Sequence, residues 1–312
     1  MSSSDLTVRD LTVRHGGVDL AVRDHGGTGT PVLLLHGASR TLADWSRVAA
    51  ELTGHHRVVS MDLRAHGHSG SGPWTFPAVL GDIEAVLAAC GIPDAALAGH
   101  SLGGMTAALY ADSHPCTPAV VNLDGHNQGV PEQYAGLDRE TALRGMARVR
   151  EAVAARAGQA VPPEVFDAVR AQQAAMAESL GIGPEIFEEA AARGFAETAD
   201  GHRLLRPERG PALQMLDAMH ALDLFPLYRR LRCRLLVVRA GRLAAQGGEL
   251  AWFDELMAAL SQGLDRELAE LAAGHGHIAL RTLDATHAML LERPREVALL
   301  IREHVGAQTL RS

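Results

Sequence analysis

The stretch Ala96–Gly104 constrains this chain more than any other. It reads Ala-Leu-Ala-Gly-His-Ser-Leu-Gly-Gly, and a helical pattern continues from Leu102 to Tyr110. An apolar strand, a Gly-X-Ser-X-Gly turn and a helix form the context in which this motif holds a nucleophilic serine. The turn is so tight that the residues two positions away from Ser101 must lack bulk. The helix directs its free N–H groups and its positive dipole end at the reacting atom. We therefore expect Ser101 to be a nucleophile; the alternative is an ordinary glycine-rich turn between a strand and a helix.

Composition and charge narrow the class of protein. The chain has 312 residues, 47% of them hydrophobic, which is enough to bury one large core and a smaller addition. A net charge of −8 disfavours nucleic acid as a partner and offers no basic patch for a membrane surface. The scattered Cys90, Cys116 and Cys233 fit neither a disulfide framework nor a metal site, so we expect a reducing cytoplasm. We see no signal peptide and no apolar run long enough to span a bilayer. The sequence leaves the oligomeric state open.

Strands and helices alternate over much of the chain. Hydrophobic patterns predict strands at residues 6–14, 18–24, 32–35, 57–63, 94–99, 118–123, 234–239 and 277–283. They predict helices at residues 45–52, 76–90, 102–114, 249–272 and 294–305. The first two strands form a hairpin around Gly16-Gly17. The remaining alternation predicts a parallel sheet with right-handed crossovers.

The pattern changes after Gly129. Helices are expected at residues 139–157, 164–180, 184–193 and 211–220, no convincing strand is found, and residues 198–209 read as a loop. This block is predicted to be a helical cap or lid. The chain then divides into a first core part (1–128), the cap (129–230) and a second core part (231–312).

At this point the order of parts resembles the α/β-hydrolase fold, in particular members with a serine nucleophile and a helical cap. The resemblance covers nearly the whole chain and is specific for the superfamily but not for a substrate. It implies a mostly parallel eight-stranded sheet flanked by helices, with the cap inserted. The motifs that carry it are His36-Gly37-Ala38-Ser39, Asp62-Leu63-Arg64-Ala65-His66-Gly67-His68-Ser69, Gly99-His100-Ser101-Leu102-Gly103-Gly104, and Thr286-His287 followed by Glu292-Arg293-Pro294.

The resemblance places the base on a loop after the last strand, where the sequence has His287. The acid is a departure from the family pattern. Most members carry an Asp after the strand here spelled Leu235–Val238, but residues 239–246 contain no carboxylate. Some members supply the acid at the end of the strand after the nucleophile helix, which is Asp124 here. We favour Asp124 as the carboxylate that orients the base.

Other assignments are less direct. Asp284, close to the base on the same loop, and Glu249, at the start of a helix, are the alternative acids. The oxyanion hole is expected from the backbone N–H groups of Ala38 and Leu102, with Gly37 allowing close approach. Substrate contacts are expected from His100 in the motif and from apolar residues of the cap, although packing of the cap on the core explains the latter equally well. Those apolar residues are Met219, Leu222 and Phe225.

These assignments predict a serine hydrolase that cleaves a small apolar ester, lactone or thioester through an acyl-enzyme on Ser101. Nothing in the sequence implies a metal or a cofactor, and the expected partner is a small-molecule substrate. One alternative keeps the fold and changes the reaction to C–C bond hydrolysis, amide cleavage or a lyase step. Another is a receptor-like binding protein with slow turnover. Dehalogenase and epoxide hydrolase chemistry is disfavoured, because those relatives attack with an Asp where this chain has Ser101.

Overall fold

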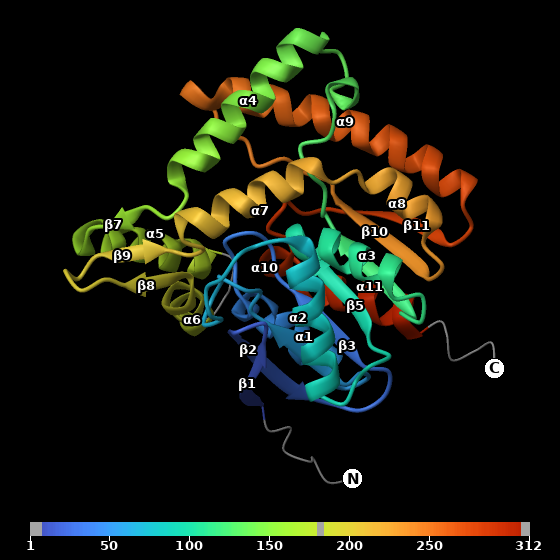
Figure 1. Cartoon of the computed structure of the whole chain (residues 1–312). Coiled ribbons are helices and arrows are strands. Elements are labelled where there is room, and N and C mark those ends of the chain that lie inside the picture. Colours follow the sequence, from blue (N-terminus) through green and yellow to red (C-terminus); the bar gives the residue numbers. More distant parts are fainter. Residues whose placement is uncertain (1–7, 180–183, 307–312) are drawn as a thin grey trace.

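An eight-stranded sheet runs through the computed structural model, which describes residues 8–179 and 184–306 (Figure 1). In the spatial order given below, each of the first two strands runs antiparallel to the strand that follows it, and the remaining five neighbouring pairs are parallel. This confirms the predicted α/β class. The predicted first strand starts at residue 6, outside the described residues. In spatial order the strands are β1 (Arg9–His15), β2 (Val18–Gly26), β4 (Val58–Met61), β3 (Val32–Leu35), β5 (Ala96–His100), β6 (Ala119–Leu123), β10 (Arg234–Ala240) and β11 (Ile278–Leu283).

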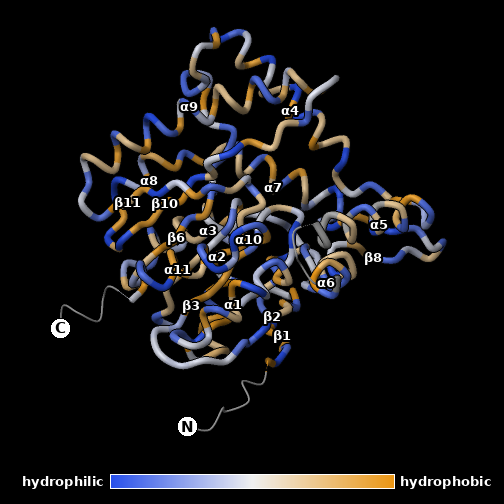
Figure 2. Tube along the Cα trace, turned by 180° about the vertical axis from the view of Figure 1, so that it is seen from behind, coloured by the Kyte–Doolittle hydropathy of each residue, from blue (hydrophilic) through white to orange (hydrophobic). Residues whose placement is uncertain are grey.

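Helices cover both faces of this sheet because its central strands are apolar on both sides. In β3, Leu33 and Leu35 belong to one hydrophobic cluster, and Val32 and Leu34 belong to the other. The first cluster includes residues of α2 (Phe76–Ala89) and α3 (Leu102–Ser113), and the second includes α1 (Ser46–Leu52) and α11 (Pro294–Gly306). Figure 2 shows hydrophobic colour along the segment labelled β3, in the lower half of the view, whereas outer helices such as α9 mix hydrophobic and hydrophilic turns.

The segment between β6 and β10, which we call the insertion (residues 129–230), contains the predicted helices and some unpredicted elements. Its helices are α4 (Arg139–Arg156), α5 (Pro163–Ser179), α6 (Pro184–Gly194), α7 (Arg209–Ala221) and α8 (Leu224–Arg230), preceded by the 3₁₀ turn Pro131–Gln133. The predicted end of the second helix at residue 180 lies outside the described residues. Helix α8 has only seven residues, too few for a clear helical period, and the sequence analysis missed it.

The expectation that the insertion has no strand, and that residues 198–209 form only a loop, was wrong. A small antiparallel sheet joins β7 (Ala160–Val161), β9 (Arg203–Leu205) and β8 (Phe195–Glu197). Strands of two or three residues are too short to produce a period-two pattern, so pairing with neighbours decides their conformation. Figure 1 shows this sheet, with α5 and α6, at one side of the molecule.

The insertion packs on the core in two ways. Met215 of α7 and Leu227 of α8 belong to the same hydrophobic cluster as the central strands. Ala142 and Met146 of α4 pack instead on the long helix α9 (Ala251–Gly274), which follows the 3₁₀ turn Gly248–Leu250. In Figure 1, α4 and α9 lie side by side above α7. The division into core and cap at residues 129 and 230 stays a prediction. In the described residues, no helix combines the length and the apolar character needed to cross a bilayer.

Candidate active site

Ser101 occupies a strained turn between β5 and α3. Its backbone has φ 53° and ψ −118°, a conformation that residues with a side chain rarely adopt. Close backbone contacts require glycine two positions before and two positions after Ser101. A Cβ added to Gly99 would lie 2.1 Å from the carbonyl carbon of Gly103, and one added to Gly103 would lie 2.1 Å from the carbonyl oxygen of Leu35. Strand and helix therefore touch through backbone. The Ser101 hydroxyl forms no hydrogen bond with any of the described residues and is free to meet a ligand.

Asp124 and His287 come together from opposite parts of the chain. Asp124 follows β6 directly, and His287 lies on the loop between β11 and α10 (Met289–Glu292). His287 Nδ1 donates a hydrogen bond of 2.8 Å to Asp124 Oδ2, and the carboxylate is only 5% exposed. This contact fixes the ring orientation and leaves Nε2 as the nitrogen that can take a proton. The ring is not hydrogen-bonded to Ser101 here, and such contacts often tighten only with bound substrate.

Asn122 shapes the turn that presents Asp124. Asp124 has φ 51°, in the left-handed region that Asp adopts more readily than most residues. The buried Asn122 side chain accepts a hydrogen bond of 2.7 Å from Gly125 N–H and donates one of 2.8 Å to the Gly125 carbonyl. It also donates to the Tyr228 hydroxyl at 2.6 Å. This role of Asn122 was not predicted, and the only signal for it in the sequence is a polar residue inside an apolar strand.

Arg239, at the end of β10, holds the other oxygen of the same carboxylate. Its Nη1 donates to Asp124 Oδ1 at 2.5 Å, and Ala240 N–H donates to that oxygen at 3.1 Å. Burial alone would raise the pKa of Asp124, but the hydrogen bond from His287 and the positive charge of Arg239 outweigh it and hold the pKa well below its usual range. The carboxylate is therefore ionised at neutral pH. The sequence shows that this strand end lacks an acid, but the contact of Arg239 with Asp124 was not predicted.

His100 makes a contact that was not predicted. We expected a substrate contact, but its side chain is buried and its Nε2 donates a hydrogen bond of 2.8 Å to the carbonyl of His287. The two rings lie 4.6 Å apart. Burial, with a smaller contribution from His287, lowers the pKa of His100 to about 3, so the ring is neutral. The end of β5 directs this side chain toward the His287 loop, and a contact with substrate stays a prediction. His100 supports the backbone of His287.

The loop after β3 brings backbone N–H groups toward Ser101. His36, fully buried, donates from Nδ1 to the Gly37 carbonyl at 2.8 Å and accepts from Leu63 N–H at Nε2 at 2.9 Å, which fixes the loop. A Cβ on Gly37 would lie 3.2 Å from Ser101 Cβ, so the loop reaches the nucleophile closely. Leu102 opens α3, and its N–H has no acceptor within the helix. Ala38 N–H finds no acceptor among the described residues. Both amides stay our predicted oxyanion donors.

A cavity of about 360 Å³ lies beside Asp124, between the end of β6 and helices α8 and α9. Asp124 and Arg239 line its polar end, and Leu222 and Phe225 line an apolar part. Met219 is not among its lining residues and packs on the main hydrophobic cluster. All three apolar residues expected to contact substrate pack on the main hydrophobic cluster, and Leu222 and Phe225 also line this cavity. Ser101 and His287 are not among the residues that line it.

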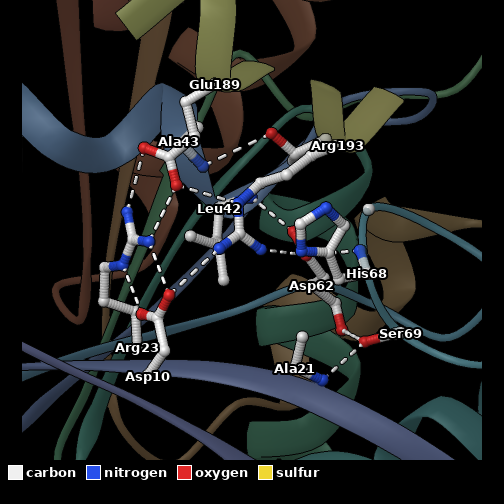
Figure 3. A network of polar contacts seen from close by, with 12 residues as sticks. Asp10, Ala21, Arg23, Leu42, Ala43, Asp62, His68, Ser69, Glu189 and Arg193 are labelled. Atoms are coloured by element: carbon white, nitrogen blue, oxygen red, sulfur yellow. Dashed lines mark hydrogen bonds and ion pairs between the residues drawn. The ribbon is translucent and has the colours of Figure 1, made fainter. Parts of the chain in front are cut away.

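Asp62 connects the insertion to the loops around the site (Figure 3). Its Oδ1 accepts from Leu42 N–H at 2.7 Å, just after the loop that carries Ala38. Its Oδ2 accepts from His68 N–H at 2.9 Å and from Nη1 of Arg193, on α6, at 2.8 Å. Arg193 also contacts Glu189 on the same helix and Asp10 on β1. The buried ion pair between Arg193 and Asp62 thus fixes α6 against the core.

Arg193→Gln is expected to lower the free energy of unfolding by roughly 2 kcal/mol, because it leaves a buried carboxylate without its cation. The backbone N–H groups of Leu42 and His68 still donate to Asp62 in this variant, which limits the loss of stability. Urea unfolding followed by circular dichroism measures it. Arg144→Gln is the control, because Arg144 pairs with Glu140 on an exposed face of α4 and should change stability little. If the two variants had the same free energy of unfolding, the ion pair between Arg193 and Asp62 would not be what holds α6 on the core.

The order and direction of the eight strands, with helices on both faces, define the α/β-hydrolase fold. The comparisons identify the family. The model of the alpha/beta hydrolase family matches residues 32–299, and the chain belongs to that family.

Individual relatives differ in reaction. Lipase LipV of Mycobacterium tuberculosis is 27% identical over 295 residues, which cover 93% of this chain and 98% of that protein. The fluoroacetate dehalogenase of a Burkholderia species is 35% identical over 97 residues, covering 29% and 32%. The chain matches the first relatives over less than half of their own length.

Solved structures agree on the fold. The crystal structure of E-2-(acetamidomethylene)succinate hydrolase superposes with a TM-score of 0.70 at 20% identity, covering 96% of this chain and 100% of that one. At this identity the likeness concerns the fold alone.

Proposed function

We propose that the protein is a serine hydrolase that cleaves a small apolar ester, lactone or thioester, with Ser101, His287 and Asp124 as its catalytic residues. The observation that carries the proposal is the 2.8 Å hydrogen bond from His287 Nδ1 to the buried Asp124 carboxylate, at the same sheet edge as the strained Ser101 turn. Relatives named lipase and esterase support the ester as the substrate class.

The proposed mechanism has two halves. His287 Nε2 takes the proton of Ser101 as its oxygen attacks the substrate carbonyl, and the N–H groups of Ala38 and Leu102 hold the oxyanion. His287 then gives that proton to the leaving group. A water molecule, deprotonated by His287, attacks the acyl-enzyme and returns free Ser101. Asp124 stays ionised throughout, which its lowered pKa supports.

Substrate selection is assigned to the insertion and to the cavity beside Asp124. Leu222 and Phe225 supply apolar surface there, and we propose that they contact the substrate. We assign residues 129–230 as the cap, because they leave the sheet after β6 and return to it at β10. No observation favours C–C bond or amide cleavage over ester cleavage, so a substrate panel separates these reactions.

A fluorophosphonate probe tests the nucleophile. We expect the wild-type protein to be labelled and Ser101→Ala to remain unlabelled. Ser113→Ala, at the far end of α3, is the control and should label like the wild type. Hydrolysis of short p-nitrophenyl esters, compared with lactones, amides and vinylogous diketones, then identifies the reaction. A folded wild-type protein that neither reacts with the probe nor cleaves any ester would overturn the proposal in favour of a binding protein.

A further inference from the structure

We propose that Arg239 is a positioning residue that partly neutralises Asp124 and thereby sets the pH range in which His287 can act as a base. The proposal rests on the function assigned above. At the end of β10, where most members of the family carry an acid, this chain has Arg239. Arg239 contacts Asp124, the acid that this chain carries after β6 instead. The two carboxylate oxygens are divided between the partners, Oδ1 for Arg239 and Oδ2 for His287.

Arg239 is built into the site and does not lie at the protein surface. Its side chain is 5% exposed. Besides Asp124, it donates from Nε to Asp265 at 3.0 Å and from Nη2 to Ser261 at 3.1 Å, and both acceptors are on α9. Three donors of the planar guanidinium group are thus fixed by three partners. A guanidinium group is charged at every pH at which the protein is folded, so its effect on Asp124 is permanent.

The electrostatic consequence follows from the shared carboxylate. An ionised Asp124 stabilises the protonated ring of His287, and a cation on the same carboxylate reduces that stabilisation. Solvent screens the contact between Arg239 and Asp124 little, because both side chains are buried, whereas the His287 ring is 54% exposed and feels the charge of Arg239 in part screened. We therefore expect Arg239 to disfavour the protonated ring of His287, and the variants below test this expectation.

The other charged or titratable groups around the pair do not replace this cation. His126 Nε2 lies 3.9 Å from Asp124 Oδ1, and burial lowers the pKa of His126, so it is mainly neutral. His100 faces His287 and is neutral for the same reason. Asp265 is 55% exposed and offsets part of the Arg239 charge. Glu267 of α9 lines the adjacent cavity and accepts from Gln133. Among the described residues, Arg239 supplies the permanent positive charge that contacts Asp124.

The test compares the pH dependence of variants of the full-length protein. In Arg239→Gln, the acid limb of kcat/KM for a p-nitrophenyl ester should move to higher pH by about half a unit or more. Arg239→Lys keeps the charge and should stay near the wild-type position. Asp265→Asn should move the limb the opposite way, by roughly 0.2 unit, because it removes an exposed negative charge that opposes Arg239. Arg230→Gln, which breaks an exposed pair with Asp112, is the control and should not shift it.

The opposite sign of the two shifts separates this role from a structural one, because general loosening of the site would not reverse direction. The titration midpoint of the His287 ring, followed by NMR, should show the same shifts without any turnover. If Arg239→Gln does not fold, the shift measured in Asp265→Asn still tests the role of Arg239. An unmoved midpoint in Arg239→Gln, or in Asp265→Asn, overturns the role of Arg239. If the NMR shifts occur as predicted but the fluorophosphonate does not label Ser101, the proposed function is wrong and the role of Arg239 stands.

Discussion

Asp124→Asn is expected to lower kcat/KM for ester hydrolysis by about 10⁴, the loss typical of a triad whose acid can no longer hold the base in the right tautomer. An amide at position 124 can present its NH₂ group to His287 Nδ1, which then binds as an acceptor and leaves the proton on Nε2, where it blocks proton uptake. It also leaves Arg239 without its buried counter-ion. Steady-state kinetics at saturating and limiting ester, with circular dichroism to verify folding, measures the loss.

Two other carboxylates serve as matched controls. Asp284 lies on the same loop as His287, but it is 76% exposed and pairs with Arg242 on the surface. Glu249 lies in the exposed 3₁₀ turn before α9. Asp284→Asn and Glu249→Gln should retain activity within about twofold of the wild type. The assignment of the acid would be wrong if one of them lost activity while Asp124→Asn retained it.

The sequence was informative where local backbone requirements select the residue type. Glycines at 99 and 103 predicted the Ser101 turn, because a strand and a helix that touch through backbone tolerate no side chain there. The choice of Asp124 came from a different argument: the family position near residue 240 lacks an acid. The structure brings Asp124 to His287, and its catalytic role remains our proposal.

What could not be predicted depends on contacts between distant segments. Arg239 reaches Asp124 because β10 and β6 are neighbours in register, with Val238 opposite Leu123. No periodicity reveals which side chain meets which at a sheet edge. The same holds for His100, whose ring donates a hydrogen bond to a backbone carbonyl 187 positions away, a contact that was not predicted. Arg193 likewise appeared only as the last residue of a helix, without its partner Asp62.

Gly103→Ala is expected to destabilise the protein by roughly 4 kcal/mol or more, although alanine is the better helix former. The added methyl group would lie 2.1 Å from the Leu35 carbonyl oxygen and 2.8 Å from that of His36. Both neighbours are backbone, so α3 must move away from β3, and Ser101 moves with it. Urea unfolding measures the effect, and fluorophosphonate labelling reports the displaced nucleophile. Gly210→Ala in α7, where an added Cβ meets no atom within 4 Å, is the control and should be neutral or slightly stabilising. If both alanine variants were as stable as the wild type and labelled equally fast, the close contact between β3 and α3 would not be what positions Ser101.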